Sequence, residues 1–160
     1  LLILVPRHPE RFNTMFELCQ QQGFATVRRS SGAPVNAQTS VLLGDTMGEL
    51  LFLYALADSA FVGGSLVPNG GHNLLEPAAL AKPVISGPHL FNFLEIAAMM
   101  REAGALREVE DAEGLAEAVR QLFELPQDAQ KMAQAGLKVM QGNQGALKRL
   151  LDGIDRLINR

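Results

Sequence analysis

Short apolar runs alternate with helical segments along this chain, and the alternation predicts an α/β fold. Residues 1–5 are continuously apolar, as expected for a strand covered on both faces, and further short strands are predicted at residues 24–28, 41–43, 59–62, 83–86 and 106–109. Helical spacing occurs at residues 10–22, 47–57, 73–81, 93–103, 112–125, 127–140 and 144–158. Because strands that alternate with helices favour parallel sheets with right-handed crossovers, we expect one such domain over residues 1–160.

Turn and cap residues give the expected bounds of several helices. Gly23 suits the C-terminal cap of the first helix. Thr46 and Glu49 have the spacing of a capping box, which predicts a helix that starts at residue 47. Pro126 and Gly142 are interpreted as the breaks between the last three helical segments.

Composition excludes several classes of protein. With 48% hydrophobic and 19% charged residues, the chain is too apolar to be disordered, and its net charge of −3 argues against general nucleic-acid binding. Cys19 is the only cysteine, so no intrachain disulfide forms, and we expect it in the core. Since the chain begins with Leu1 directly in an apolar run, we interpret it as a fragment of a longer protein.

The glycine-rich segment at residues 63–77 carries the strongest functional signal. Two glycine pairs follow an apolar run and precede a helical segment, and glycines let a backbone approach a ligand closely. The unpaired N–H groups of a new helix attract anions, which predicts a phosphate site. Asn73 and Glu76 have two interpretations. They form a capping box, or the backbone N–H groups of this first helical turn hold phosphate while Glu76 accepts hydrogen bonds from ribose hydroxyls.

Two further segments follow predicted strands. Ligands of open parallel sheets bind beyond the carboxyl ends of the strands, so we expect all three segments to converge on one nucleotide or sugar phosphate. Arg7 follows the first strand, and its planar guanidinium suits phosphate or carboxylate. Met47 and Gly48 follow the third strand, where they contact a base or ribose or, alternatively, belong to a capped helix with Met47 in the core.

The sequence lacks the motifs of several other nucleotide-binding and catalytic sites. There is no GxGxxG after the first strand, no P-loop and no GxSxG elbow. The three histidines lack the spacing of metal ligands, so we expect no metal and no cofactor. Arg28 and Arg29 are interpreted as a solvated pair.

The motifs together resemble a known family. PRHPERF from Pro6, GDTMGEL from Gly44, FVGGSL from Phe61, GGHNLLEPAALAKPVISGPHLFNF from Gly70 and QGNQGALKRLL from Gln141 resemble the 3-deoxy-D-manno-octulosonic acid (Kdo) transferases, in their C-terminal domain. The resemblance implies a Rossmann-like, three-layer α/β fold with a parallel sheet, the C-terminal half of a GT-B glycosyltransferase.

The resemblance also implies a donor and its contacts. This half would bind CMP-Kdo, without cofactor or metal, through nine residues: Pro6, Arg7, Thr46, Met47, Gly48, Asn73, Leu74, Leu75 and Glu76. The catalytic base would be a glutamate of the missing N-terminal domain, so this fragment would hold no catalytic residue beyond Arg7 as a phosphate stabiliser.

The whole enzyme would act in lipopolysaccharide biosynthesis. It would transfer Kdo to a lipid A precursor, bound by the missing domain, at the cytoplasmic face of the bacterial inner membrane, with no nucleic-acid partner. Two alternatives stay open. One is a non-catalytic nucleotide or sugar-phosphate-binding module, and the other is a different GT-B enzyme, such as a UDP-sugar epimerase or a lipid A disaccharide synthase.

Overall fold

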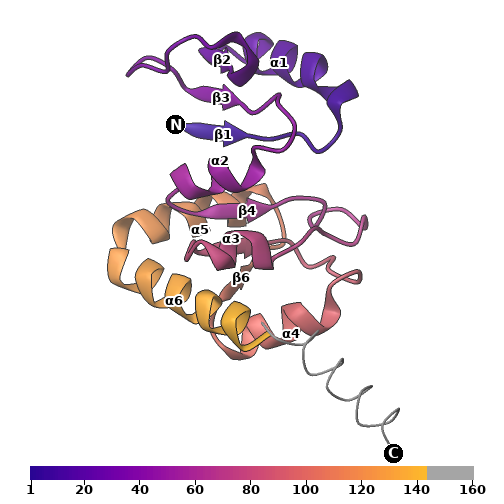
Figure 1. Cartoon of the computed structure of the whole chain (residues 1–160), viewed down its shortest axis with the longest axis vertical. Coiled ribbons are helices and arrows are strands. Elements are labelled where there is room, and N and C mark those ends of the chain that lie inside the picture. Colours follow the sequence, from indigo (N-terminus) through magenta and orange to yellow (C-terminus); the bar gives the residue numbers. More distant parts are fainter. Residues whose placement is uncertain (144–160) are drawn as a thin grey trace, which may run out of the picture. The chain divides into compact units, whose positions relative to one another are not determined.

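The chain forms two compact α/β units, each built on a three-stranded parallel sheet (Figure 1). The computed structural model describes residues 1–143. The first unit is Leu1–Ala57, and the second begins at Asp58. The predicted α/β class and parallel pairing are confirmed, whereas the single domain expected from the sequence stays a prediction.

The six strands of residues 1–143 lie where the sequence predicts them. Their bounds are β1 (Leu2–Leu4), β2 (Thr26–Arg28), β3 (Val41–Leu43), β4 (Ala60–Val62), β5 (Val84–Ser86) and β6 (Leu106–Glu108). The first sheet has the order β1-β3-β2, and the second has the order β4-β5-β6. In the first sheet both Leu4 and Arg28 are in register with Leu43, so all three strands end level with one another.

Helices follow most strands. Their bounds are η1 (Pro9–Arg11), α1 (Phe12–Gln21), η2 (Arg29–Ser31), α2 (Leu50–Leu56), α3 (Leu75–Ala79), α4 (Leu94–Glu102), α5 (Ala112–Glu124) and α6 (Pro126–Asn143). The helix predicted at residues 144–158 lies outside the described residues. In the described part of the chain, no helix is both long and apolar enough to cross a membrane.

The predicted bounds of α2 and α6 are wrong. The helix expected from residue 47 begins at Leu50, because Gly48 has a left-handed φ of +81°, which a right-handed helix does not allow. α6 includes Pro126 as its first residue, where the missing N–H leaves no bond unmade, and it continues through Gly142. These two residues therefore do not bound the helix predicted at 127–140.

The first unit packs α1 on its sheet. α1 contacts β2 and β3, and Cys19 on its inner face is 8% exposed, which confirms its predicted place in the core. Gly23 follows the helix with a φ of +81°, the left-handed conformation expected of a glycine that ends a helix.

The sheet of the second unit is buried on both faces. Val62 and Val84 belong to a cluster on one face with residues of α3, α4 and α6. Phe61 and Ile85, which point the opposite way because side chains alternate along a strand, pack with residues of α5. This unit therefore has three layers: helices, sheet and helix.

A close contact fastens α6 to α3. A Cβ added to Gly136 of α6 would lie 3.3 Å from Cβ of Ala78, which is completely buried in α3. Both residues are small, so the two helices approach closely, and α6 packs along α3.

Candidate functional site

The carboxyl edge of the first sheet brings two of the three predicted segments together. Because β1, β3 and β2 end level, the residues that follow them, 6–9, 44–49 and 29–31, lie along one edge. The N–H of Gly44 donates to the carbonyl oxygen of Leu4 at 2.8 Å, and a Cβ on Gly44 would lie 2.8 Å from Cδ1 of Leu53. Gly44 therefore allows the chain to leave β3 close beside β1.

Arg7 is exposed at this edge. It lies three residues after the end of β1, next to the partly buried Pro6, and it precedes the 3₁₀ turn η1. Arg7 therefore lies near the strand end at which the sequence predicts a phosphate ligand.

Residues 44–49 form an irregular loop between β3 and α2. Met47 is 69% exposed, so the alternative of a core methionine is wrong. Gly48 takes a conformation that favours glycine, and Thr46 and Glu49 are partly buried. The Thr46 hydroxyl donates to Oε2 of Glu49, a bond between two side chains in place of the predicted capping box.

Asp45 anchors the start of this loop. Its Oδ1 accepts from the backbone N–H of Ser30 at 2.8 Å, and its Oδ2 accepts from the Ser30 hydroxyl at 2.6 Å. The side chain of Asp45 is only 3% exposed, and Nη1 of Arg28 lies 3.7 Å from Oδ2. Burial by itself would raise the pKa of Asp45, but the hydrogen bonds from Ser30 and the charge of Arg28 outweigh it, and the pKa is lowered.

The interpretation of Arg28 and Arg29 as a solvated pair is wrong. Nη2 of Arg29 donates to Oε1 of Glu49 at 2.8 Å. Nη2 of Arg28 donates to Oδ1 of Asn13 at 2.6 Å, and its guanidinium lies 4.5 Å from the centre of the Phe16 ring. The sequence did not reveal these contacts because they depend on the pairing of β2 with β3, and the sequence of a strand does not indicate which strand it pairs with.

The glycine-rich segment follows β4 in the second unit. The N–H of Gly71 donates to the carbonyl oxygen of Gly64 at 2.9 Å, which closes a loop, and Gly64, Gly70 and Gly71 all have positive φ. A Cβ on Gly70 would lie 2.2 Å from Nδ2 of Asn92, and one on Gly71 would lie 2.5 Å from Cδ2 of Leu90. The loop therefore needs these glycines for its own closure against residues 89–92.

Ser65 joins this loop to the end of β5, a role that the sequence did not signal. Its hydroxyl, which is fully buried, donates to the carbonyl oxygen of Val62 at 2.6 Å and accepts from the N–H of Gly87 at 2.8 Å. The N–H of His89 donates to the Ser65 carbonyl oxygen at 3.0 Å. A Cβ on Gly87 would lie 2.3 Å from that same oxygen, so only glycine fits there.

Asn73 and Glu76 lie at the start of α3. The helix begins at Leu75, with Leu74 before it, two residues later than predicted. Oδ1 of Asn73 accepts from the N–H of Leu75 at 3.0 Å, and Nδ2 of Asn73 donates to Oε1 of Glu76 at 3.3 Å. Leu74 is completely buried, so the polar groups of Asn73 and Glu76, both partly exposed, face outward from this turn.

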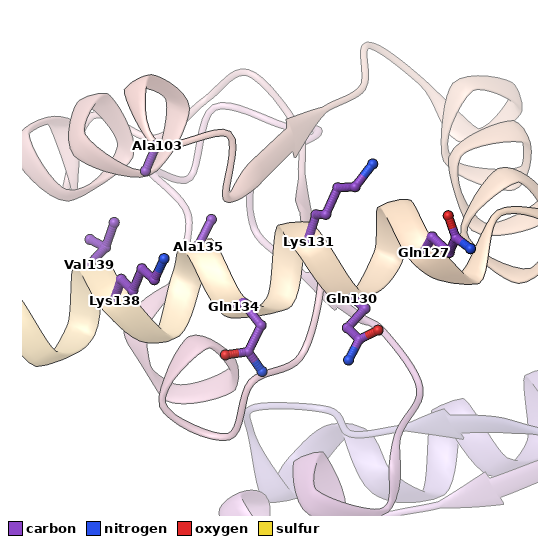
Figure 2. A pocket seen from close by; sticks show the side chains of 8 residues that line it. All are labelled: Ala103, Gln127, Gln130, Lys131, Gln134, Ala135, Lys138 and Val139. Atoms are coloured by element: carbon purple, nitrogen blue, oxygen red, sulfur yellow. The ribbon is translucent and has the colours of Figure 1, made fainter.

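A separate pocket of about 850 Å³ lies along α6 (Figure 2). Ala135 and Val139 point toward Ala103, whereas Gln130 and Gln134 point to the other side of the helix (Figure 2). The nine predicted site residues do not line it. Among residues 1–143, no group of three or more His, Cys, Asp and Glu side chains is arranged to hold a metal ion.

Comparison with known proteins identifies the family. The sequence profile of the glycosyl transferases group 1 matches residues 25–139. The 3-deoxy-D-manno-octulosonic acid transferase of Haemophilus influenzae is 47% identical over the whole chain, and that of Bordetella pertussis is 42% identical over 97% of it. The chain spans only 38% and 36% of the lengths of these two relatives.

A solved structure agrees with the sequence relatives. The crystal structure of the C-terminal CMP-Kdo binding domain of WaaA from Acinetobacter baumannii superimposes with a TM-score of 0.84 at 42% identity. The match covers 87% of this chain and 72% of that one. The chain therefore belongs to the group 1 glycosyl transferases and, within them, to the Kdo transferase family, with the fold of its C-terminal GT-B domain.

Proposed function

We propose that this chain binds CMP-Kdo as the donor-binding half of a Kdo transferase. The similarity to the CMP-Kdo binding domain from Acinetobacter baumannii carries the proposal, because it extends over most of both chains in sequence and in fold. Two relatives that match along nearly the whole chain, from Haemophilus influenzae and Bordetella pertussis, are both Kdo transferases and support the same donor.

The proposed donor contacts are assigned in each unit separately: at the carboxyl edge of the sheet in the first, and at the start of α3 in the second. In the first unit, Arg7 binds phosphate beside Pro6, and the loop residues Thr46, Met47 and Gly48 contact the nucleoside. In the second unit, residues 73–76 contribute polar groups at the start of α3. The N–H of Leu75 already donates to Asn73, so Asn73 and Glu76 are the groups that we assign to the ribose hydroxyls.

The chemistry of transfer explains the arginine. Kdo is joined to CMP through its anomeric carbon, so CMP is the leaving group and negative charge grows on its phosphate as that bond breaks. A guanidinium held at the phosphate stabilises this charge in the transition state, and such electrostatic stabilisation is usually the largest catalytic contribution. The attacking hydroxyl belongs to the acceptor, which we propose is a lipid A precursor bound by an N-terminal domain that also supplies a glutamate base.

The cellular setting follows from the same proposal. A lipid A precursor resides in a membrane, so we propose that the full-length enzyme works in lipopolysaccharide synthesis at the cytoplasmic face of the bacterial inner membrane. Without its acceptor domain, the 160-residue chain would bind the nucleotide and transfer nothing.

Nucleotide preference tests the donor. We expect CMP to raise the melting temperature of this chain by several degrees at concentrations well above its Kd, whereas UMP and UDP leave it nearly unchanged. A larger shift with UDP than with CMP would contradict the proposal and favour a UDP-sugar enzyme of the same architecture.

Arg7→Ala tests the phosphate contact in the full-length enzyme. Loss of one stabilising donor costs about 3 kcal/mol of barrier, so we expect Kdo transfer to fall ~100-fold. Arg120→Ala is the control, because Arg120 is exposed on α5 and forms ion pairs with Glu117 and Glu124 of the same helix. Near-normal turnover by Arg7→Ala would remove Arg7 from the mechanism.

A further inference from the structure

We infer that Arg29 and Glu49 are positioning residues for the nucleoside-binding loop and that they fix which atom Thr46 presents to the ligand. The inference rests on the proposed function, since it concerns how residues 44–49 meet CMP. The loop carries a left-handed glycine at Gly48 and an exposed Met47, so neither helix hydrogen bonds nor apolar burial hold these two residues in place.

Side chains from η2 and from the loop itself hold it instead. Ser30 bonds to both carboxylate oxygens of Asp45 at the start of the loop, with distances of 2.8 and 2.6 Å. Arg29 bonds to Oε1 of Glu49 at the end of the loop, at 2.8 Å, and Thr46 bonds to Oε2. We call these five residues the loop clamp. It fastens the loop on both sides of Met47 and Gly48.

The hydrogen bond to Glu49 determines whether the Thr46 hydroxyl can donate to a ligand or only accept from it. A carboxylate paired with an arginine accepts hydrogen bonds and donates none, so the Thr46 hydroxyl must be the donor of its hydrogen bond to Glu49. The hydroxyl oxygen then offers only lone pairs to a ligand. Phosphate oxygens also act as acceptors, whereas ribose hydroxyls and the amino group of cytosine donate. The clamp therefore directs Thr46 toward the nucleoside of CMP and away from its phosphate.

Arginine substitutions test the clamp in the 160-residue chain. We expect Arg29→Met to weaken CMP binding about tenfold, measured by calorimetry, and to speed amide hydrogen exchange at Met47 and Gly48. Arg101→Met is a matched control in the second unit, because Arg101 forms a comparable pair with Glu108, at 2.5 and 2.6 Å, and has a similar exposure of 42% against 39% for Arg29. We expect the control to change neither readout, and Arg29→Lys to recover part of the affinity.

Thr46 variants test whether the hydroxyl oxygen accepts a hydrogen bond from the nucleoside. Thr46→Val keeps the shape and removes the oxygen, and we expect it to weaken CMP and cytidine by the same factor of about ten in parallel titrations. Thr46→Ser keeps the hydroxyl, and we expect it to bind both with an affinity near that of the unmodified chain. A loss of CMP affinity with cytidine affinity intact would place Thr46 at the phosphate and overturn this part of the inference.

The outcomes separate the clamp from the proposed function. If the unmodified chain binds CMP but Arg29→Met leaves both affinity and exchange unchanged, the clamp is wrong and the donor proposal stands. If the unmodified chain binds no CMP at millimolar concentration, the donor proposal fails, and the inference about its nucleoside fails with it.

Discussion

Replacing Ser65 with alanine tests how the glycine-rich loop is held. The buried hydroxyl makes two hydrogen bonds, at 2.6 Å to the Val62 carbonyl oxygen and at 2.8 Å from the Gly87 N–H. Alanine removes both and leaves the Gly87 N–H without its acceptor at a position that water does not reach. A buried donor left without a partner costs about 1–3 kcal/mol, and with the second bond lost we expect about 2–3 kcal/mol of destabilisation.

The expected change is large enough to measure by calorimetry. For a folded unit of about 100 residues, 2–3 kcal/mol lowers the melting temperature by about 10–14 °C. Ser86→Ala is the matched control, because Ser86 is equally buried but its hydroxyl donates only to the adjacent Gly87 carbonyl oxygen, at 3.1 Å. We expect a loss of less than ~4 °C for the control. Equal losses in the two variants would refute the assignment of Ser65 as the link between β4 and β5.

Three further substitutions follow from the same structure. Gly87→Ala places a Cβ 2.3 Å from the Ser65 carbonyl oxygen, so we expect it to lower the melting temperature of the second unit. Gly63→Ala is the control, because its added Cβ has nothing within 4 Å, and we expect it to melt like the unmodified chain. Similar melting temperatures for the two variants would contradict the steric argument. Because the pKa of Asp45 is lowered in the folded state, its charged form contributes stability above the ordinary carboxylate pKa, and that stability disappears as pH falls through the folded pKa. Asp45→Asn should therefore be less stable than the unmodified chain at pH 7, and the gap should close below about pH 4; a gap that stays constant from pH 7 to pH 3 would count against it. Glu76→Gln should weaken CMP binding more than it lowers the melting temperature, and a large melting loss with CMP affinity intact would leave Glu76 as only a partner of the α3 turn.

The sequence predicted the elements better than the contacts between them. The sequence located all six strands of the described residues, and the signal is clearest where the strand is apolar and buried, as in β3 and β5. The start of α2 is predicted three residues too early because Thr46 and Glu49 have capping-box spacing. The sequence does not indicate that Gly48 takes a left-handed φ. Propensity rules treat such a glycine as a weak helix residue, not as a break.

The candidate site was predicted in the same uneven way. Arg7 and residues 46–48 stand out because they follow strands, and the register of β1 with β3 places both segments at one sheet edge. Arg29 and Ser30 have no such signal, because their partners lie 20 and 15 residues away and depend on which strand β2 joins. The sequence also does not predict the positive φ values and close contacts of Gly70 and Gly71, and it therefore explains these glycines only by the close approach of a ligand.

The contact between Gly136 and Ala78 has a consequence for how far this chain can be shortened. α3, which carries Glu76, is only five residues long and too short to be stable by itself, and its inner face is covered in part by α6. A truncated protein that ended after α5 would leave that face bare and would lose the turn that precedes it. The smallest autonomous version must therefore extend through α6, so segments some sixty positions downstream of the glycine-rich loop are needed to preserve it.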